Sequence, residues 1–409
     1  MKNLSRFALT GAMVLVLGSA GVGFADSPPA KPQVSNAAAK DLQAAQKAIG
    51  DKNYDAALAS LDKVKANSKK NEYDEYVMDE FYFTAFAGQQ KYDQAEAPLE
   101  AAIASKYMPP DELKKRLYQA ALLNYQIKNY DKAVDFGNRA IEHGDTTAPT
   151  QTLVAQAYYF KDDFKDADHF IRGLVDNQIQ AGQVPEEEML HLGLSAAAKQ
   201  NDMPGESHWL ELMVSYHPSP EYWEDLLDTM YHNKLNDRQT LQLYRLSADV
   251  GVLKRGSEYG EMAQLAMDAG SPGEAVAVLN RAFAANVFVD QSEKARNQHL
   301  LDLAKKQAAT DQPTLAKVEA EAGNAATGDR LVGAGLGYFS YGDYAKAITD
   351  ISAGLAKGTA KDAIDARLSL GIAQLRAGDK DSAVKTFNSV KGDAVYERLA
   401  ELWVLRTKT

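Results

Sequence analysis

Apolar side chains recur along this chain in the pattern of short helices joined by tight turns. Each clear turn ends in an aromatic residue. A small residue follows three positions later, and a large apolar residue follows four positions after that. These spacings place both on one helix face, so a helix is predicted on each side of the turn. We expect the aromatic ring to fill the wedge between the two helices. The clearest turns end at Tyr54, Tyr92, Tyr130, Phe164 and Tyr344.

The turns recur at a nearly constant distance. Those from Tyr54 to Phe164 are separated by 38, 38 and 34 residues. Weaker turns continue the period toward the C-terminus, at Met203, Asp237, Pro272, Pro313 and Lys380. A fixed period of this length is typical of stacked helical hairpins, because no hairpin can bury its apolar face alone. The pattern therefore predicts an all-α array of about ten hairpins rather than a globular enzyme core.

Several hairpins resemble the tetratricopeptide repeat. In that family a small and an aromatic residue lie three positions apart in the first helix, as Gly335 and Tyr338 do here, and likewise Ala155 and Tyr158. The resemblance extends over residues 37–407. It implies a right-handed superhelical solenoid in which the first helix of each hairpin lines a concave face.

The array is expected to be continuous over residues 37–407 but degenerate over 200–260 and 295–325. In the first of these stretches, Glu206 replaces the small residue that the repeat requires. Residues 396–406 combine apolar and polar positions at helical spacing and predict an amphipathic helix that closes the array.

The N-terminus is typical of a cleaved secretory signal over residues 1–25. Lys2 and Arg6 precede an apolar run that ends in small residues, and cleavage is expected near Ala25. The run is short for a hydrocarbon core of ~30 Å, which favours cleavage over the alternative of a retained membrane anchor. Residues 26–36 are rich in proline and are expected to form a flexible leader. The chain is therefore expected in the periplasm, with secretion as the alternative.

Composition restricts the partners and the chemistry. The chain has no cysteine, which excludes disulfides and thiolate sites. Its net charge is −11, and loss of Lys2 and Arg6 with the signal would lower it by two, to −13. Lysine and arginine form no stripe, so nucleic acid is not an expected partner. After signal cleavage, no remaining segment is apolar enough to be expected to span a membrane.

No motif predicts catalysis, a cofactor or a metal site. Glu188 and His191 form one Glu-x-x-His step, whereas carboxylate-bridged metal sites in helix bundles need two. Residues 333–337 are rich in glycine, but a nucleotide-binding loop would follow a strand. Gly335 instead falls on the small-residue position of the repeat. A protein that is not an enzyme is therefore expected.

Candidate binding residues come from the resemblance, which places certain positions of each first helix on the concave face. Here they carry tyrosine and histidine with polar neighbours, a combination that can stack on and hydrogen-bond an extended peptide. The expected groove residues are Tyr118, Tyr125, Gln126, Gln156, Tyr159, His191, Tyr222, Asp225, His232 and Asn233. The same positions also hold Leu122, Thr152, Phe160, Ser195 and Lys199.

These observations predict a non-catalytic scaffold or adaptor of the cell envelope that binds a protein or peptide in its groove. The chain also resembles secreted repeat proteins that accompany TonB-type energising systems. The alternative is a subunit or enzyme of glycan or peptidoglycan metabolism, since an aromatic groove can also hold sugar rings. Self-association through apolar terminal repeats is a third hypothesis, for which Trp403 and Val404 would supply the surface.

Overall fold

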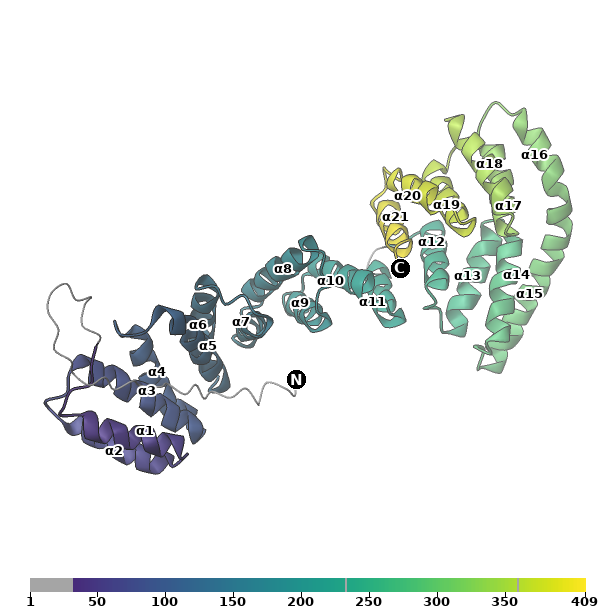
Figure 1. Ribbon diagram of the computed structural model, residues 1–409. Helices are drawn as coiled ribbons and strands as arrows, with labels where there is room; N and C mark the ends of the chain where they lie inside the picture. The colour runs from purple at the N-terminus through teal and green to yellow at the C-terminus, as the bar shows by residue number, and fades with distance from the viewer. Residues whose placement is uncertain (1–31, 232–233, 359) are drawn as a thin grey trace. The chain divides into compact units, whose positions relative to one another are not determined.

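The computed structural model describes residues 32–231, 234–358 and 360–409. All regular elements in these ranges are helices, which confirms the prediction of an all-α fold (Figure 1). The chain divides into two compact units, with unit 1 ending at Asn201 and unit 2 running from Asp202 to Thr409. The predicted signal peptide and residues 26–31 lie outside the described residues. Export, cleavage near Ala25 and continuity of the array over 37–407 stay predictions.

Unit 1 is built from helices that pack in adjacent pairs. Its elements are α1(Ala39–Gly50), α2(Tyr54–Ala66), α3(Glu72–Gly88), α4(Tyr92–Ala104), α5(Pro110–Gln126), α6(Tyr130–Glu142), α7(Ala148–Phe160), α8(Phe164–Gln180) and α9(Glu187–Lys199). The two helices of each hairpin contact each other, and so do the first helices of neighbouring hairpins, α1 with α3, α5 with α7, and α7 with α9. The first helices therefore form a continuous row, as the repeat pattern predicted.

Unit 2 continues the pairing with one exception. Its elements are α10(Met203–Tyr216), α11(Pro220–Tyr231), α12(Asp237–Asp249), α13(Gly256–Asp268), α14(Pro272–Ala284), α15(Gln291–Asp311), η2(Gln312–Thr314), α16(Leu315–Gly323), α17(Asp329–Ser340), α18(Tyr344–Ala356), α19(Ala363–Arg376), α20(Lys380–Asn388) and α21(Ala394–Arg406). Near Pro313 the backbone keeps right-handed helical angles at Asp311, Gln312 and Leu315. As a result, α15 runs through η2 into α16 instead of folding back on it (Figure 1). The hairpin expected at this weak turn does not form.

The turns follow one backbone rule. The residue directly before the turn aromatic is the N-cap of the second helix; the carboxylates of Asp163 and Asp343, for example, accept the N–H of the residue three positions on. The residue before the N-cap has a positive φ in every clear turn. These left-handed residues are Lys52, Gln90, Lys128, Asp162, Asn201, Gly270, Gly342 and Gly378. A tight turn, rather than any particular side chain, is therefore what the motif encodes.

Replacing Gly342 with Ala should destabilise unit 2 by about 1–2 kcal/mol, the cost of holding an L-residue in the left-handed region. The φ of Gly342 is 79°, and an added Cβ would meet no atom within 4 Å, so the cost is one of backbone conformation alone. Gly333→Ala is the matched control. Gly333 is exposed within α17 and equally free of neighbours, so alanine there should stabilise the helix by about 0.5–1 kcal/mol. Urea unfolding should separate the two variants, and a shift in the same direction for both would contradict the rule.

The small residues of the pattern lie where helices approach closely. The alanines three positions after the turn aromatic have no exposed surface: Ala57, Ala95, Ala133, Ala167, Ala275, Ala347 and Ala383. At Gly335 an added Cβ would stand 2.7 Å from Ile351 Cγ1, so α17 and α18 could not pack as they do. The glycine-rich segment is thus a packing feature, as predicted.

The turn aromatic reaches farther than its own hairpin. A Cβ added at Gly88, the last residue of α3, would lie 2.3 Å from the Tyr54 ring of the preceding hairpin. Likewise, Tyr344 at the start of α18 accepts a 3.4 Å hydrogen bond at its hydroxyl from Arg376 of α19. The wedge that the aromatic fills therefore includes the first helix of the next hairpin.

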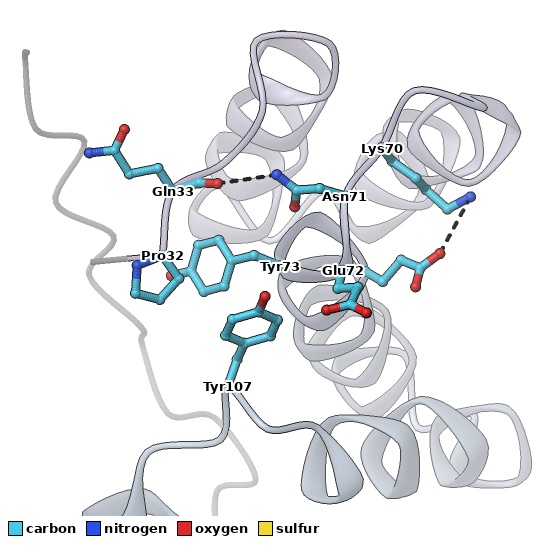
Figure 2. Close-up of a pocket in the computed structure, with 8 residues that line it drawn as sticks. Pro32, Gln33, Lys70, Asn71, Glu72, Tyr73 and Tyr107 are labelled. Carbon is cyan, nitrogen blue, oxygen red and sulfur yellow. Dashed lines mark hydrogen bonds and ion pairs between the residues drawn. The ribbon is translucent and has the colours of Figure 1, made fainter. Parts of the chain in front are cut away.

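The last residues of the predicted leader are fixed against α3. The backbone N–H and the hydroxyl of Ser35 donate to the Asp74 carboxylate at 2.9 and 2.6 Å. Asn71 caps α3 and also donates to the Gln33 carbonyl at 3.4 Å (Figure 2). Val34 packs against the core of the first hairpins. The flexible part of the leader therefore does not extend to residues 33–35.

Unit 2 closes on itself, because its last helices pack against its first ones (Figure 1). From α21, Arg398 donates to Glu211 of α10 at 2.5 Å, and Arg406 donates to Asp249 of α12 at 2.9 Å. From α12, Gln242 donates to Asp365 of α19 at 2.8 Å. The prediction of a closing helix at the C-terminus is confirmed.

This closure corrects the expectation that Trp403 supplies an apolar docking face. Trp403 has no exposed surface, and its ring stacks on Phe387 at 5.9 Å between centroids. The neighbouring Val404 is half-buried. The indole is therefore part of the core of unit 2 and is not available to a second copy.

Candidate binding surfaces

The predicted groove residues are divided between the units. Those of unit 1 are Tyr118, Tyr125, Gln126, Gln156, Tyr159 and His191. Tyr222 and Asp225 lie on α11 of unit 2, the first half-buried and the second exposed. His232 and Asn233 lie outside the described residues. The unit 1 residues can therefore be assessed as one group, and the others stay separate predictions.

Two hydrogen bonds join the first helices of three successive hairpins in unit 1. The Tyr125 hydroxyl on α5 donates to Gln156 Oε1 on α7 at 3.1 Å. The Tyr159 hydroxyl on α7 and the Ser195 hydroxyl on α9 share a bond of 2.7 Å. Burial raises the pKa of Tyr125 to about 12, so its hydroxyl remains protonated at neutral pH. The structure thus brings these predicted residues together and fixes the positions of both tyrosine rings.

Around them lies a contiguous group of rings, which we call the aromatic surface: Tyr125, Tyr130, Tyr159, Phe160 and Phe164. Phe160 lies at its centre, with its ring 5.7 Å from both Tyr130 and Tyr159 and 6.1 Å from Tyr125. Phe164 contacts Tyr159 at 5.3 Å. Phe160 is also 41% exposed, a large fraction for a phenylalanine. The group therefore presents a broad aromatic face with one accessible ring.

Sequence reasoning assigned Tyr130 and Phe164 to the scaffold only, because each ends a turn of the repeat. In the structure the same rings also complete the aromatic surface. The available signal was that Phe160 and Phe164 come just before and after one turn. Rings so placed, beside Tyr125 and Tyr130 of the preceding turn, can meet across neighbouring hairpins.

The remaining unit 1 residues lie around this surface or apart from it. Tyr118 is half-buried on α5 and packs against the core of the second to fourth hairpins, and burial raises its pKa. Gln126 is exposed at the end of α5. His191 is exposed on α9, with Nε2 4.0 Å from Glu187 rather than near Glu188. Within the described ranges, no three His, Asp or Glu side chains converge in a way that could hold a metal ion.

A second candidate surface lies at the start of α3. Figure 2 shows a hollow of about 500 Å³ where the rings of Tyr73 and Tyr107 lie beside Pro32. The two rings meet edge to face, with centroids 5.2 Å apart. Lys70 forms an ion pair with Glu75 on the rim at 3.6 Å. This hollow is smaller in aromatic content than the aromatic surface, and its charges are largely paired.

An adjoining hollow of about 280 Å³ holds Asp79, a half-buried carboxylate. Burial, reinforced by the nearby charges of Glu75 and Glu80, raises the pKa of Asp79 to about 6. A carboxyl with a raised pKa favours folding at low pH. Its contribution is complete below the unfolded pKa near 4 and is lost as the pH rises through about 6.

Asp79→Asn should therefore stabilise unit 1 at pH 7 by up to about 1 kcal/mol, after allowance for solvent screening, and change little at pH 4. Hydrogen exchange of α3 peptides at pH 4.5 and 7.0 would measure the difference. Asp176→Asn, an exposed position on α8, is the control and should change exchange equally at both pH values. If D79N kept the full wild-type pH dependence, the Asp79 carboxyl would not be its source.

Comparison with known proteins supports the repeat pattern in both units. The family model of the tetratricopeptide repeat matches residues 83–149 and 332–395. No curated protein matches the chain. Among the described helices, none has the length and apolar character required to cross a bilayer.

Solved structures with similar helical arrangements include three repeat proteins. The TPR2AB domain of yeast Sti1 in its pHSP90 complex is 13% identical, with a TM-score of 0.25, covering 73% of this chain and 97% of that one. The apo form of RapI is 13% identical, with a TM-score of 0.30 and coverages of 79% and 88%. Yeast Tom70 is 10% identical, with a TM-score of 0.24 and coverages of 91% and 95%. TM-scores this low support no inference about function.

Proposed function

We propose that this chain, which carries tetratricopeptide repeats in both units, is a non-catalytic scaffold that binds an extended segment of a partner protein on the aromatic surface of unit 1. The observation that carries this proposal is the contiguous group of five rings with Phe160 exposed at its centre. Single exposed rings are ordinary on protein surfaces, but a contiguous aromatic patch is typical of interaction sites.

The chemistry of the surface suits a peptide. Aromatic rings contribute large contact areas at low entropic cost, and tyrosine adds a hydroxyl at the edge of an apolar face. Around Phe160, the exposed side chain of Gln126 and the half-buried side chain of Lys161 supply polar groups. A peptide with alternating apolar and polar side chains would therefore find partners for both along the row of first helices.

We propose further that the chain acts in the cell envelope. The basic start, apolar run and small-residue end of residues 1–25 support export, as does the absence of cysteine-dependent sites elsewhere. The resemblance to repeat proteins that accompany TonB-type systems makes components of such systems the first partners to test. N-terminal sequencing of the protein from a periplasmic extract should begin at residue 26, and recovery of intact Met1 in the cytoplasm would contradict export.

Photocrosslinking in cells tests the binding surface directly. A photoreactive residue at Phe160 or Gln126 should give a protein adduct that mass spectrometry can identify. The same residue at Asp135, exposed on the second helix α6, is the matched control and should give none. Equal labelling from all three positions would contradict a specific site. An adduct with glycan instead of protein would support the alternative of a glycan-binding function.

Phe160→Ala should weaken binding of the crosslinked partner about tenfold while leaving the fold intact, because truncating an exposed aromatic at the centre of an interface removes a typical hot spot. The 41% exposed ring contributes little to the core, so the circular dichroism spectrum should not change. Affinity measured with the purified partner would give the ratio. Asp135→Ala is the control, and comparable losses in both variants would exclude the aromatic surface.

A further inference from the structure

Unit 2 holds a cavity of about 580 Å³ that the repeat pattern and the proposed function do not use. It lies among the ends of α12, α14, α17 and α19, within the part of the unit that closes on itself. Its volume is in the range of small-molecule sites. Its walls combine apolar, aromatic and charged side chains; those that matter below are Met262, Val276, Phe339, Arg281, Arg376 and Glu274.

The negative charges of the wall are already neutralised by groups that do not line the cavity. Glu274 accepts two hydrogen bonds from the buried Arg245, at 2.9 and 2.7 Å. Asp249 accepts one from Arg406 at 2.9 Å. Neither arginine is part of the lining. The carboxylates therefore do not call for a cationic ligand.

The positive charges are not matched in this way. Arg281 and Arg376 form no ion pair among the described residues, whereas the carboxylates beside them do. The Arg376 guanidinium lies 5.5 Å from the Phe339 centroid and 5.8 Å from that of Tyr344. It donates one hydrogen bond, of 3.4 Å, to the Tyr344 hydroxyl. The two rings thus hold the guanidinium in place and leave most of its five N–H donors for another acceptor.

We propose that this cavity binds a small organic anion. A carboxylate or phosphate head would accept paired hydrogen bonds from Arg376, for which a planar guanidinium is well suited. The apolar body would lie against Met262, Val276 and Phe339. An acidic chain with net charge −11 thus concentrates unmatched positive charge in one enclosed place, which general surface electrostatics would not produce.

Calorimetry with matched probes tests this proposal on the full mature chain. The probes are 2-naphthoate, 2-naphthyl phosphate and the neutral 2-naphthamide. At least one anion should bind saturably at one site and at least tenfold more tightly than the amide. The better anion identifies the head group. Equal binding of anions and amide, or no saturable binding of either anion, would overturn the proposal without any mutant.

Variants locate the site. Arg376→Gln should lower the affinity for the better anion at least tenfold, to about that of the amide, because a hydrogen bond to a charged group contributes that much. Arg367→Gln, on the same helix but outside the lining, is the control and should leave affinity unchanged. Arg281→Gln, exposed and harmless to the fold, should weaken binding several-fold even if R376Q proves unstable. Unchanged anion preference in both cavity variants would contradict the assignment.

Discussion

Replacing Arg245 with Met is expected to destabilise unit 2 by about 3–5 kcal/mol, because it leaves a carboxylate buried without its partner. The side chains of Arg245 and Glu274 are 4% and 8% exposed, and both Glu274 oxygens accept bonds from the guanidinium. Burial alone would raise the pKa of Glu274, but the attraction of Arg245 outweighs it and leaves that pKa below its usual range. The ion pair is therefore fully formed in the folded protein.

Hydrogen exchange of α12 and α14 peptides, together with urea unfolding, would measure the loss. The double variant R245M/E274M should recover most of it, since an apolar pair of similar volume replaces the buried charges. Arg238→Met is the matched control on the same helix. Its exposed pair with Asp362 should contribute less than about 1 kcal/mol. A double variant as unstable as R245M would refute the explanation by an uncompensated charge.

Trp403→Ala should cost a further unit 2 variant about 3–5 kcal/mol, the usual effect of removing a large buried side chain and leaving a cavity. Trp403 lies on α21 with no exposed surface and stacks on Phe387. Because α21 also packs against α12, the loss should spread beyond the C-terminal helix.

Peptide-level hydrogen exchange would test that spread. In W403A, peptides of α12 and α21 should lose protection together. Trp403→Phe is the control: it keeps an aromatic ring and removes an indole N–H that has no hydrogen-bond partner, so it should cost no more than about 1 kcal/mol. Loss of protection confined to α21 would mean that closure of the unit contributes little to its stability.

The helix pairs were predictable from the sequence because each rests on local chemistry. The N-cap residue, the left-handed residue before it and the buried alanine after the aromatic all lie within a few positions of one turn. The closing helix was also predictable, since its apolar spacing is local. The weak turn at Pro313 failed because the proline sits in a helical segment that never reverses direction.

Closure of unit 2 could not be predicted from the repeat pattern. It depends on polar residues that the pattern leaves free, such as Gln239, which donates to Asp393 across 154 positions at 3.2 Å. The opposite behaviour of the two buried ion pairs was equally inaccessible. Glu80 of unit 1 pairs with Arg116 through one oxygen only, and burial leaves its pKa raised. Such differences depend on side-chain geometry rather than on residue type.

The candidate binding site was predictable in part. Counting back from the turn identified Tyr125 and Tyr159, which the structure joins to Gln156 and Ser195. It did not identify Tyr130 and Phe164 as part of the same surface, because one ring serves both the turn and the surface.

The closure of unit 2 also limits how that part of the chain can change in length over evolution. An open array gains or loses a hairpin at little cost, since each repeat contacts only its neighbours. In unit 2 an added hairpin would move Asp365 and Arg398 away from Gln242 and Glu211 by about 8–10 Å for each helix layer inserted, and every closing bond would break. Related sequences should therefore vary in repeat number before Asp202 and keep a constant number after it.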